Sequence, residues 1–110
     1  MAERRNHPRV RVSHPVLYFT DSYPRPKVGS TVDLSRGGVR IETPYGLISG
    51  ERLEISIAIR PQVIKCKGQV MHILWPGGER LKAGIRFEEL SKQDGLYLEE
   101  YISNIIEQQT

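Results

Sequence analysis

Apolar and polar residues alternate one by one through most of the middle of this chain, and that alternation restricts its fold more than any other feature. Leu53, Ile55 and Ile57, for example, are separated by Glu54 and Ser56. A period of two places apolar side chains on one face of a β-strand and polar side chains on the other. The same kind of pattern predicts strands over residues 16–20, 28–34, 39–42, 53–59, 63–75 and 81–87.

Segments that contain proline or glycine separate these predicted strands. Because short connections join antiparallel neighbours, six half-apolar strands favour an all-β barrel or sandwich. The long run 63–75 changes phase near His72, which predicts a β-bulge or a bend there. The turn signals lie at residues 23–26, 44–46, 60–62 and 76–78.

The end of the chain has a helical rather than a strand pattern. Ser91, with Asp94 three positions later, resembles a capping box at a helix start. We therefore predict an amphipathic helix over residues 91–108 that either packs on the barrel or binds a partner. Its apolar face would consist of Leu98, Tyr101, Ile102, Ile105 and Ile106.

The length of 110 residues fits one domain, made of a flexible basic arm (1–12), a barrel (13–89) and the helix (91–108). Cys66 is the only cysteine, so an internal disulfide is excluded, and its strand-like surroundings suggest a buried apolar role. No apolar run approaches the ~20 residues of a membrane span. The arginine-rich start lacks the apolar stretch of a secretory signal, so we expect a cytoplasmic protein.

Catalysis finds no support in the sequence. His7, His14 and His72 are scattered, without a metal-ligand spacing or a serine and acid arranged around them. We therefore expect a non-enzyme that needs no metal and no cofactor.

The first eleven residues hold four of the 16 basic residues: Arg4, Arg5, Arg9 and Arg11. Pro8 disfavours a helix before it, and four extended residues span ~13 Å. Two guanidinium groups at that separation can grip different parts of one compact ligand, bonding phosphate oxygens or a guanine edge bidentately. The arm alone is equally compatible with a solvated basic tail.

A second polar signature, Asp-Leu-Ser-Arg-Gly-Gly, occupies residues 33–38. We expect Val28, Ser30, Val32 and Leu34 to share the inward face of their strand. Asp33 and Ser35 would then project from the barrel exterior, where a carboxylate can accept from guanine N–H groups. Gly37 and Gly38 would supply a turn in which positive φ is permitted, and would let a ligand approach the backbone closely.

In this order the two signatures resemble those of the PilZ domain, the bacterial receptor module for cyclic di-GMP. Residues 5–9 (Arg-Asn-His-Pro-Arg) fit its R-x-x-x-R pattern, and residues 33–38 fit its [D/N]-x-S-x-x-G pattern. The likeness extends to the late strand 83–87 and the terminal helix. It implies a six-stranded antiparallel β-barrel with a C-terminal helix, in agreement with the strand count.

The resemblance also implies residue roles. Arg5 and Arg9 would bind guanine edges and phosphates, and the barrel would contribute Asp33, Ser35 and Gly38. Arg4, directly before the first motif arginine, implies binding of an intercalated ligand dimer. Candidates for additional contacts are Arg11, Arg36 and Trp75, the last by stacking on a guanine.

The leading hypothesis is a stand-alone cyclic di-GMP receptor whose arm becomes ordered on binding and signals to an unidentified downstream protein. One alternative is a PilZ-like adaptor that binds only protein. Another is a small nucleic-acid-binding barrel, although we expect no specific nucleic acid as partner. The salt dependence of binding distinguishes the nucleic-acid-binding barrel from the receptor, because the affinity of nonspecific binding to nucleic-acid strands depends steeply on salt.

Overall fold

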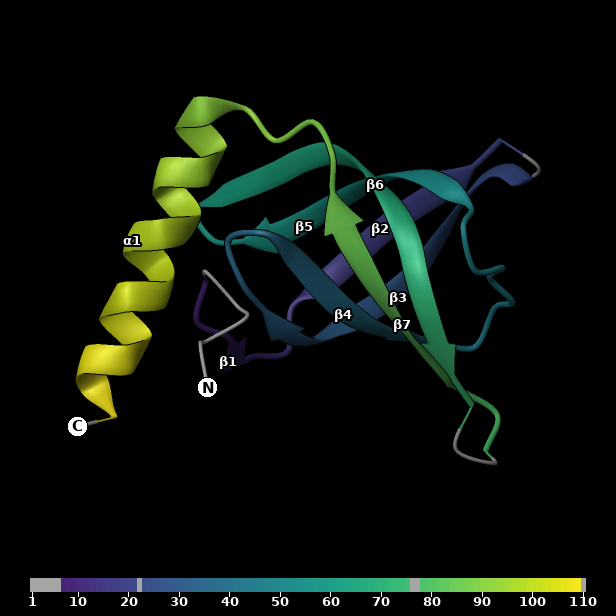
Figure 1. Ribbon diagram of the computed structural model, residues 1–110, viewed down its shortest axis with the longest axis horizontal. Coiled ribbons are helices and arrows are strands. Elements are labelled where there is room, and N and C mark those ends of the chain that lie inside the picture. Colours follow the sequence, from purple (N-terminus) through teal and green to yellow (C-terminus); the bar gives the residue numbers. More distant parts are fainter. Residues whose placement is uncertain (1–6, 22, 76–77, 110) are drawn as a thin grey trace, which may run out of the picture.

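The computed structural model describes residues 7–21, 23–75 and 78–109, and its centre is a closed barrel of six antiparallel strands (Figure 1). The order around the barrel is β3-β2-β5-β6-β7-β4, and pairing between β3 and β4 closes it. Helix α1 (Lys92–Gln108) lies across one end of the barrel (Figure 1). The six-stranded antiparallel barrel with a C-terminal helix is therefore confirmed. The strands are β2 (Pro15–Thr20), β3 (Tyr23–Leu34), β4 (Gly38–Thr43), β5 (Arg52–Ile59), β6 (Gln62–Leu74) and β7 (Leu81–Phe87).

A further short strand that the sequence did not predict, β1 (Val10–Arg11), extends this sheet. It pairs with the end of β3, Val10 opposite Leu34 and Arg11 opposite Asp33. Because β4 occupies the other edge of β3, β1 and β2 lie end to end along one edge. Residues 7–12 of the predicted arm thus follow the barrel surface, and residues 1–6 lie outside the described residues.

The inward faces of the strands form one hydrophobic core. On β5, the four residues Leu53, Ile55, Ile57 and Ile59 are at most 3% exposed. Leu81, Ala83 and Ile85 on β7 are equally buried. The alternation in both segments therefore predicted the correct inward face.

The prediction for β3 was wrong in its first half. Val28 is 59% exposed, whereas Thr31 is 3% exposed and Leu34 is fully buried. The register against β4 shifts between Thr31 and Asp33, and such a bulge reverses which residues point inward. Thr31 also bonds the segment between β1 and β2, where its hydroxyl donates to the Val12 carbonyl and accepts from the His14 amide.

Residues 23–26 were predicted as a turn but begin strand β3 instead. Proline lacks an amide donor and is tolerated where a strand has a neighbour on only one side. This part of β3 pairs with β2, whereas its pairing with β4 begins only at Ser30. The predicted bulge in β6 is confirmed, since its register against β7 shifts between Val70 and His72.

Helix α1 begins as its capping pattern predicted. Ser91 is the N-cap, and its hydroxyl accepts from the Asp94 amide at 3.1 Å. Leu98 and Ile102 are buried against the barrel. The Tyr97 hydroxyl donates to the Ile59 carbonyl at 2.9 Å, which ties the helix to the end of β5.

Candidate functional site

Asp33 on β3 forms ion pairs with two arginines, one from the N-terminal segment and one from β4. Arg9 Nη1 lies 2.5 Å from Asp33 Oδ1, and Arg40 Nη2 lies 2.9 Å from Oδ2. β1 and β4 flank β3 here, so the strand pairing itself brings residues from three segments into one row. Asp33 is only 7% exposed. One carboxylate shared by two guanidinium groups leaves a local excess of positive charge, which favours an anionic ligand.

The loop between β3 and β4 is held by the side chain of Ser35. Its hydroxyl oxygen accepts from the amides of Gly37 and Gly38, at 3.2 Å each. The Ser35 amide donates to the Gly38 carbonyl at 2.9 Å. Ser35 is 5% exposed. Its hydrogen bonds within the loop stabilise the turn.

Glycine is required at position 38 by close packing. A Cβ built on Gly38 would lie 2.4 Å from the carbonyl oxygen of Ile85 on β7. Neither Gly37 nor Gly38 uses the positive φ that glycine permits, because Gly50 is the one glycine in the described part of the chain that adopts it. Glycine at position 38 instead lets β4 approach β7 closely at the edge of the loop.

A depression of about 390 Å³ opens beside this loop. The N-terminal segment, the loop, and the neighbouring strands β6 and β7 all contribute to its wall. The size falls within the range of small-molecule sites, which are concave and carry a few convergent polar groups. The lining residues are His7, Arg9, Ser35, Gly37, Gly38, Met71, His72, Gly84, Ile85 and Arg86.

Two histidines in this wall lie over glycines. A Cβ built on Gly37 would be 3.2 Å from His7 Cδ2, and one built on Gly84 would be 2.4 Å from His72 Cε1. His72 and Gly84 face each other across β6 and β7 at the bulge. The sequence suggested a phosphate contact for His7 but favoured a solvated loop histidine, and it indicated no binding role for His72. Its one available signal was a glycine inside the β7 pattern, which marks a close approach by another group.

The structure brings some of the predicted site residues together and separates others. Arg9 contacts Asp33, and Arg9 also lines the depression with Ser35 and Gly38. Arg4 and Arg5 lie outside the described residues.

The three candidates for additional contacts are absent from the described wall of the depression. Arg11 is exposed on β1. Arg36 points to α1 and bonds Glu99 there. Trp75 is 55% exposed at the β6–β7 connection, where its Nε1 donates to the Gly78 carbonyl at 3.0 Å. The register places that connection at the other end of β7 from Gly38.

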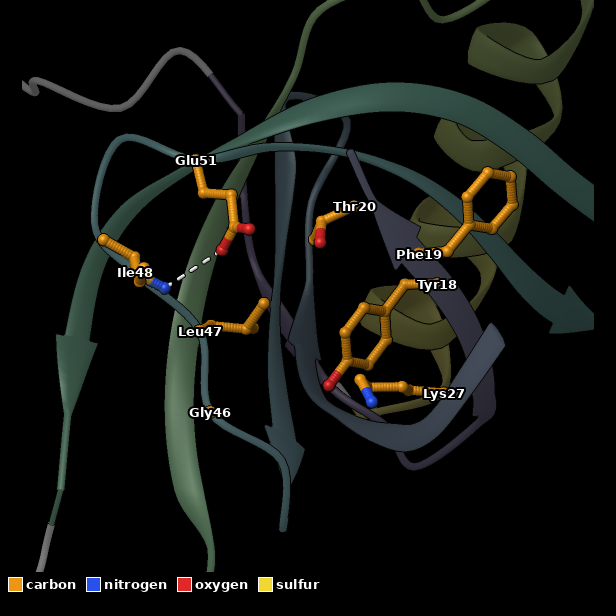
Figure 2. A pocket seen from close by; sticks show the side chains of 8 residues that line it. All are labelled: Tyr18, Phe19, Thr20, Lys27, Gly46, Leu47, Ile48 and Glu51. Atoms are coloured by element: carbon orange, nitrogen blue, oxygen red, sulfur yellow. Dashed lines mark hydrogen bonds between the residues drawn. The ribbon is translucent and has the colours of Figure 1, made fainter. Parts of the chain in front are cut away.

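A second pocket of about 380 Å³ lies away from both signatures (Figure 2). Tyr18, Leu47 and Ile48 make much of its wall, and Figure 2 shows the Ile48 amide donating to Glu51. The Tyr18 hydroxyl bonds that of Thr43 at 2.8 Å. The pocket is mainly apolar, and none of the predicted site residues that the structure describes lines it.

The described residues offer no cluster of three or more His, Cys, Asp or Glu side chains able to hold a metal ion. Within the same residues, no helix is long and apolar enough to cross a membrane.

Comparison with known proteins gives the family. The model of the PilZ domain matches residues 3–104, and the chain belongs to this family of non-catalytic cyclic di-GMP receptor domains. No curated protein matches the sequence.

Several solved structures share the fold at low sequence identity. MotI/DgrA of Bacillus subtilis, an inhibitor of motility, superposes with a TM-score of 0.86 at 20% identity, over 99% of this chain and 55% of that one. The PilZ domain of Escherichia coli YcgR with c-di-GMP gives 0.75 at 18% identity, over 96% and 94% of the two chains. The complex of K. pneumonia MrkH with c-di-GMP gives 0.77 at 16% identity, over 96% and 52%. This chain thus spans about half the length of MotI/DgrA and MrkH.

Proposed function

We propose that this chain is a receptor for cyclic di-GMP and binds it in the depression beside residues 35–38. The observation that carries the proposal is the meeting of the two sequence signatures: Arg9 reaches Asp33, 24 positions later, at the edge of the depression. The family and the structures of YcgR and MrkH with c-di-GMP support the choice of ligand.

The chemistry of the wall suits a ligand with two phosphates and two guanines. Arg9 and Arg86 can bond phosphate oxygens or the O6/N7 edge of guanine. Asp33 is not among the residues that line the depression, but it bonds Arg9 of that wall, and its remaining lone pairs can accept from guanine N–H groups. The Gly37 and Gly38 backbone allows the ligand to approach closely, and the His72 ring can stack on a base.

Arg4 and Arg5 remain part of the proposal, as ligands from the segment that precedes His7. Arg5 would complete the grip begun by Arg9, and Arg4 would favour two intercalated ligand molecules over one. Calorimetry measures how many ligand molecules bind per chain. Two per chain are expected, and one per chain would contradict the role of Arg4.

The proposed signal is the ordering of the arm by the ligand, which changes the surface that a downstream protein meets. In the described part of the arm, Val10 and Arg11 pair with β3 and Arg9 bonds Asp33. Fixing one flexible backbone residue costs about 1–2 kcal/mol, whereas a charge-assisted hydrogen bond contributes about 1.5–3 kcal/mol. Several contacts from Arg4 and Arg5 are therefore needed together.

Titration calorimetry with cyclic di-GMP tests the site. Arg9→Ala is expected to weaken binding by about 1.5–3 kcal/mol, or roughly 10- to 150-fold, because it removes charge-assisted bonds. Arg80→Ala is the matched control, since Arg80 is an exposed arginine at the far end of β7. Equal affinities of the two variants would reject the assigned site. Absence of binding together with stable capture of a partner would favour the protein-only adaptor.

A further inference from the structure

Arg36 sits in the middle of the loop that lines the depression, yet its side chain turns away onto α1. Its Nε donates to Glu99 Oε2 at 2.8 Å. Its guanidinium also covers the buried Gly95, where an added Cβ would lie 2.6 Å from Arg36 Cζ. Positions 95 and 99 are one turn apart on the same helix face. The absence of a side chain at Gly95 therefore makes the room in which the guanidinium lies.

The neighbours of Arg36 in the loop belong to the ligand depression. Ser35 and Gly37 line it on one side, while Arg36 lines a separate cleft of about 300 Å³ on the other. His7 contributes to both clefts. One stretch of backbone, residues 35–37, thus lies between the depression and the cleft against α1.

We propose that Arg36 is a positioning residue that couples occupancy of the depression to the docking of α1. This inference rests on the proposed function. Arg36 does not touch the ligand; it holds the loop in its binding geometry by contacting Gly95 and Glu99. Since coupling between two equilibria is reciprocal, a docked helix raises ligand affinity, and the bound ligand stabilises the docked helix.

In the competing arrangement, Arg36 leaves Glu99 and bonds a ligand phosphate. The two arrangements predict opposite effects of Glu99→Gln on ligand affinity. If Arg36 positions the loop, Glu99→Gln weakens binding because the loop loses its tether. If Glu99 instead competes with the ligand for Arg36, Glu99→Gln strengthens binding.

The affinities of Glu99→Gln and Arg36→Ala for cyclic di-GMP, measured by calorimetry, distinguish the two arrangements. Glu100→Gln is the control, because it removes the same charge from the neighbouring exposed position. We expect Glu99→Gln and Arg36→Ala to bind about two- to fivefold more weakly than Glu100→Gln, the range that an exposed ion pair can contribute. Glu99→Gln binding as tightly as Glu100→Gln, or more tightly, overturns the coupling. If the unmodified chain binds no cyclic di-GMP, the proposed function fails and the coupling with it.

Gly95→Ala separates positioning from mere structural support. Alanine favours helix over glycine, so the thermal midpoint should stay the same or rise, while the new methyl group displaces the guanidinium and weakens binding. Unchanged affinity in this variant contradicts the proposal.

Hydrogen exchange provides a readout at the helix itself. Ligand should slow exchange of the amides of residues 95–102 in the unmodified chain but not in Arg36→Ala. Equal slowing in both proteins overturns the coupling through Arg36.

Discussion

Gly38→Ala is the substitution whose consequence follows most directly from the structure. The new Cβ would lie 2.4 Å from the Ile85 carbonyl oxygen and 3.4 Å from Arg86 Cα. The first contact is with backbone in the paired strand β7, so no side-chain rotation relieves it. Strands β4 and β7 must separate locally at the Gly38–Arg86 pair. Overpacking of this kind costs about 1–3 kcal/mol.

The same shift reaches the ligand site, because the Gly38 amide and carbonyl both bond Ser35. Gly38→Ala should therefore lower stability and ligand affinity together. For a chain of this length, 1 kcal/mol lowers the melting temperature by about 4 °C, which predicts a decrease of about 4–12 °C.

Gly46→Ala is the matched control. Nothing lies within 4 Å of a Cβ built there, and Gly46 does not have positive φ. Alanine should therefore be neutral or stabilise the fold by up to about 1 kcal/mol through the unfolded state. The urea midpoints of both variants are compared with that of the unmodified protein, provided that the dependence of the unfolding free energy on urea concentration is unchanged. Equal midpoints for Gly38→Ala and the unmodified protein would refute the packing argument.

Other predictions concern single side chains. Asp33→Asn should destabilise the fold by about 1–2 kcal/mol in urea unfolding, a modest loss because both arginines reach solvent; unchanged stability would show that the pairs contribute nothing. His72→Ala should weaken cyclic di-GMP binding while His72→Phe retains it, and Leu74→Ala on the same strand should have no effect; equal losses in the Ala and Phe variants would exclude stacking. Burial lowers the pKa of His14, so its contribution to stability is present above pH 6.5 and is lost as pH falls through the lowered value; the urea midpoint of His14→Gln should fall less between pH 7 and 5 than that of the unmodified chain. Burial raises the pKa of the Cys66 thiol to about 12, so alkylation at pH 8 should be roughly 1,000-fold slower in the native than in the unfolded chain; similar rates would contradict its burial.

Local patterns were sufficient to predict most of the barrel. The alternation in β5 identified its buried face because regular pairing runs along the whole strand, from Arg52 opposite Gln69 to Ile59 opposite Gln62. Alternation failed in β3 because the bulge near Thr31 depends on pairing with a strand ten positions away. A single extra residue reverses the phase of every residue before it.

The site was only partly predictable for the same reason. The two signatures contain Arg9 and Asp33, but the ion pair between them depends on β1, a two-residue strand too short to show a pattern. His72 reaches the depression because the register of β6 against β7 sets it opposite Gly84. Trp75, only three positions further, lies beyond the paired region and away from the depression.

Amide chemical shifts recorded during addition of cyclic di-GMP show whether the two signatures form one ligand site. The apolar pocket near Leu47 provides an internal comparison. Saturable shifts are expected at residues 35–38, 71–72 and 84–86, with residues 46–51 unaffected. Shifts confined to residues 18–20 and 46–51, or no shifts at all in the folded protein, would contradict a single site formed by both signatures.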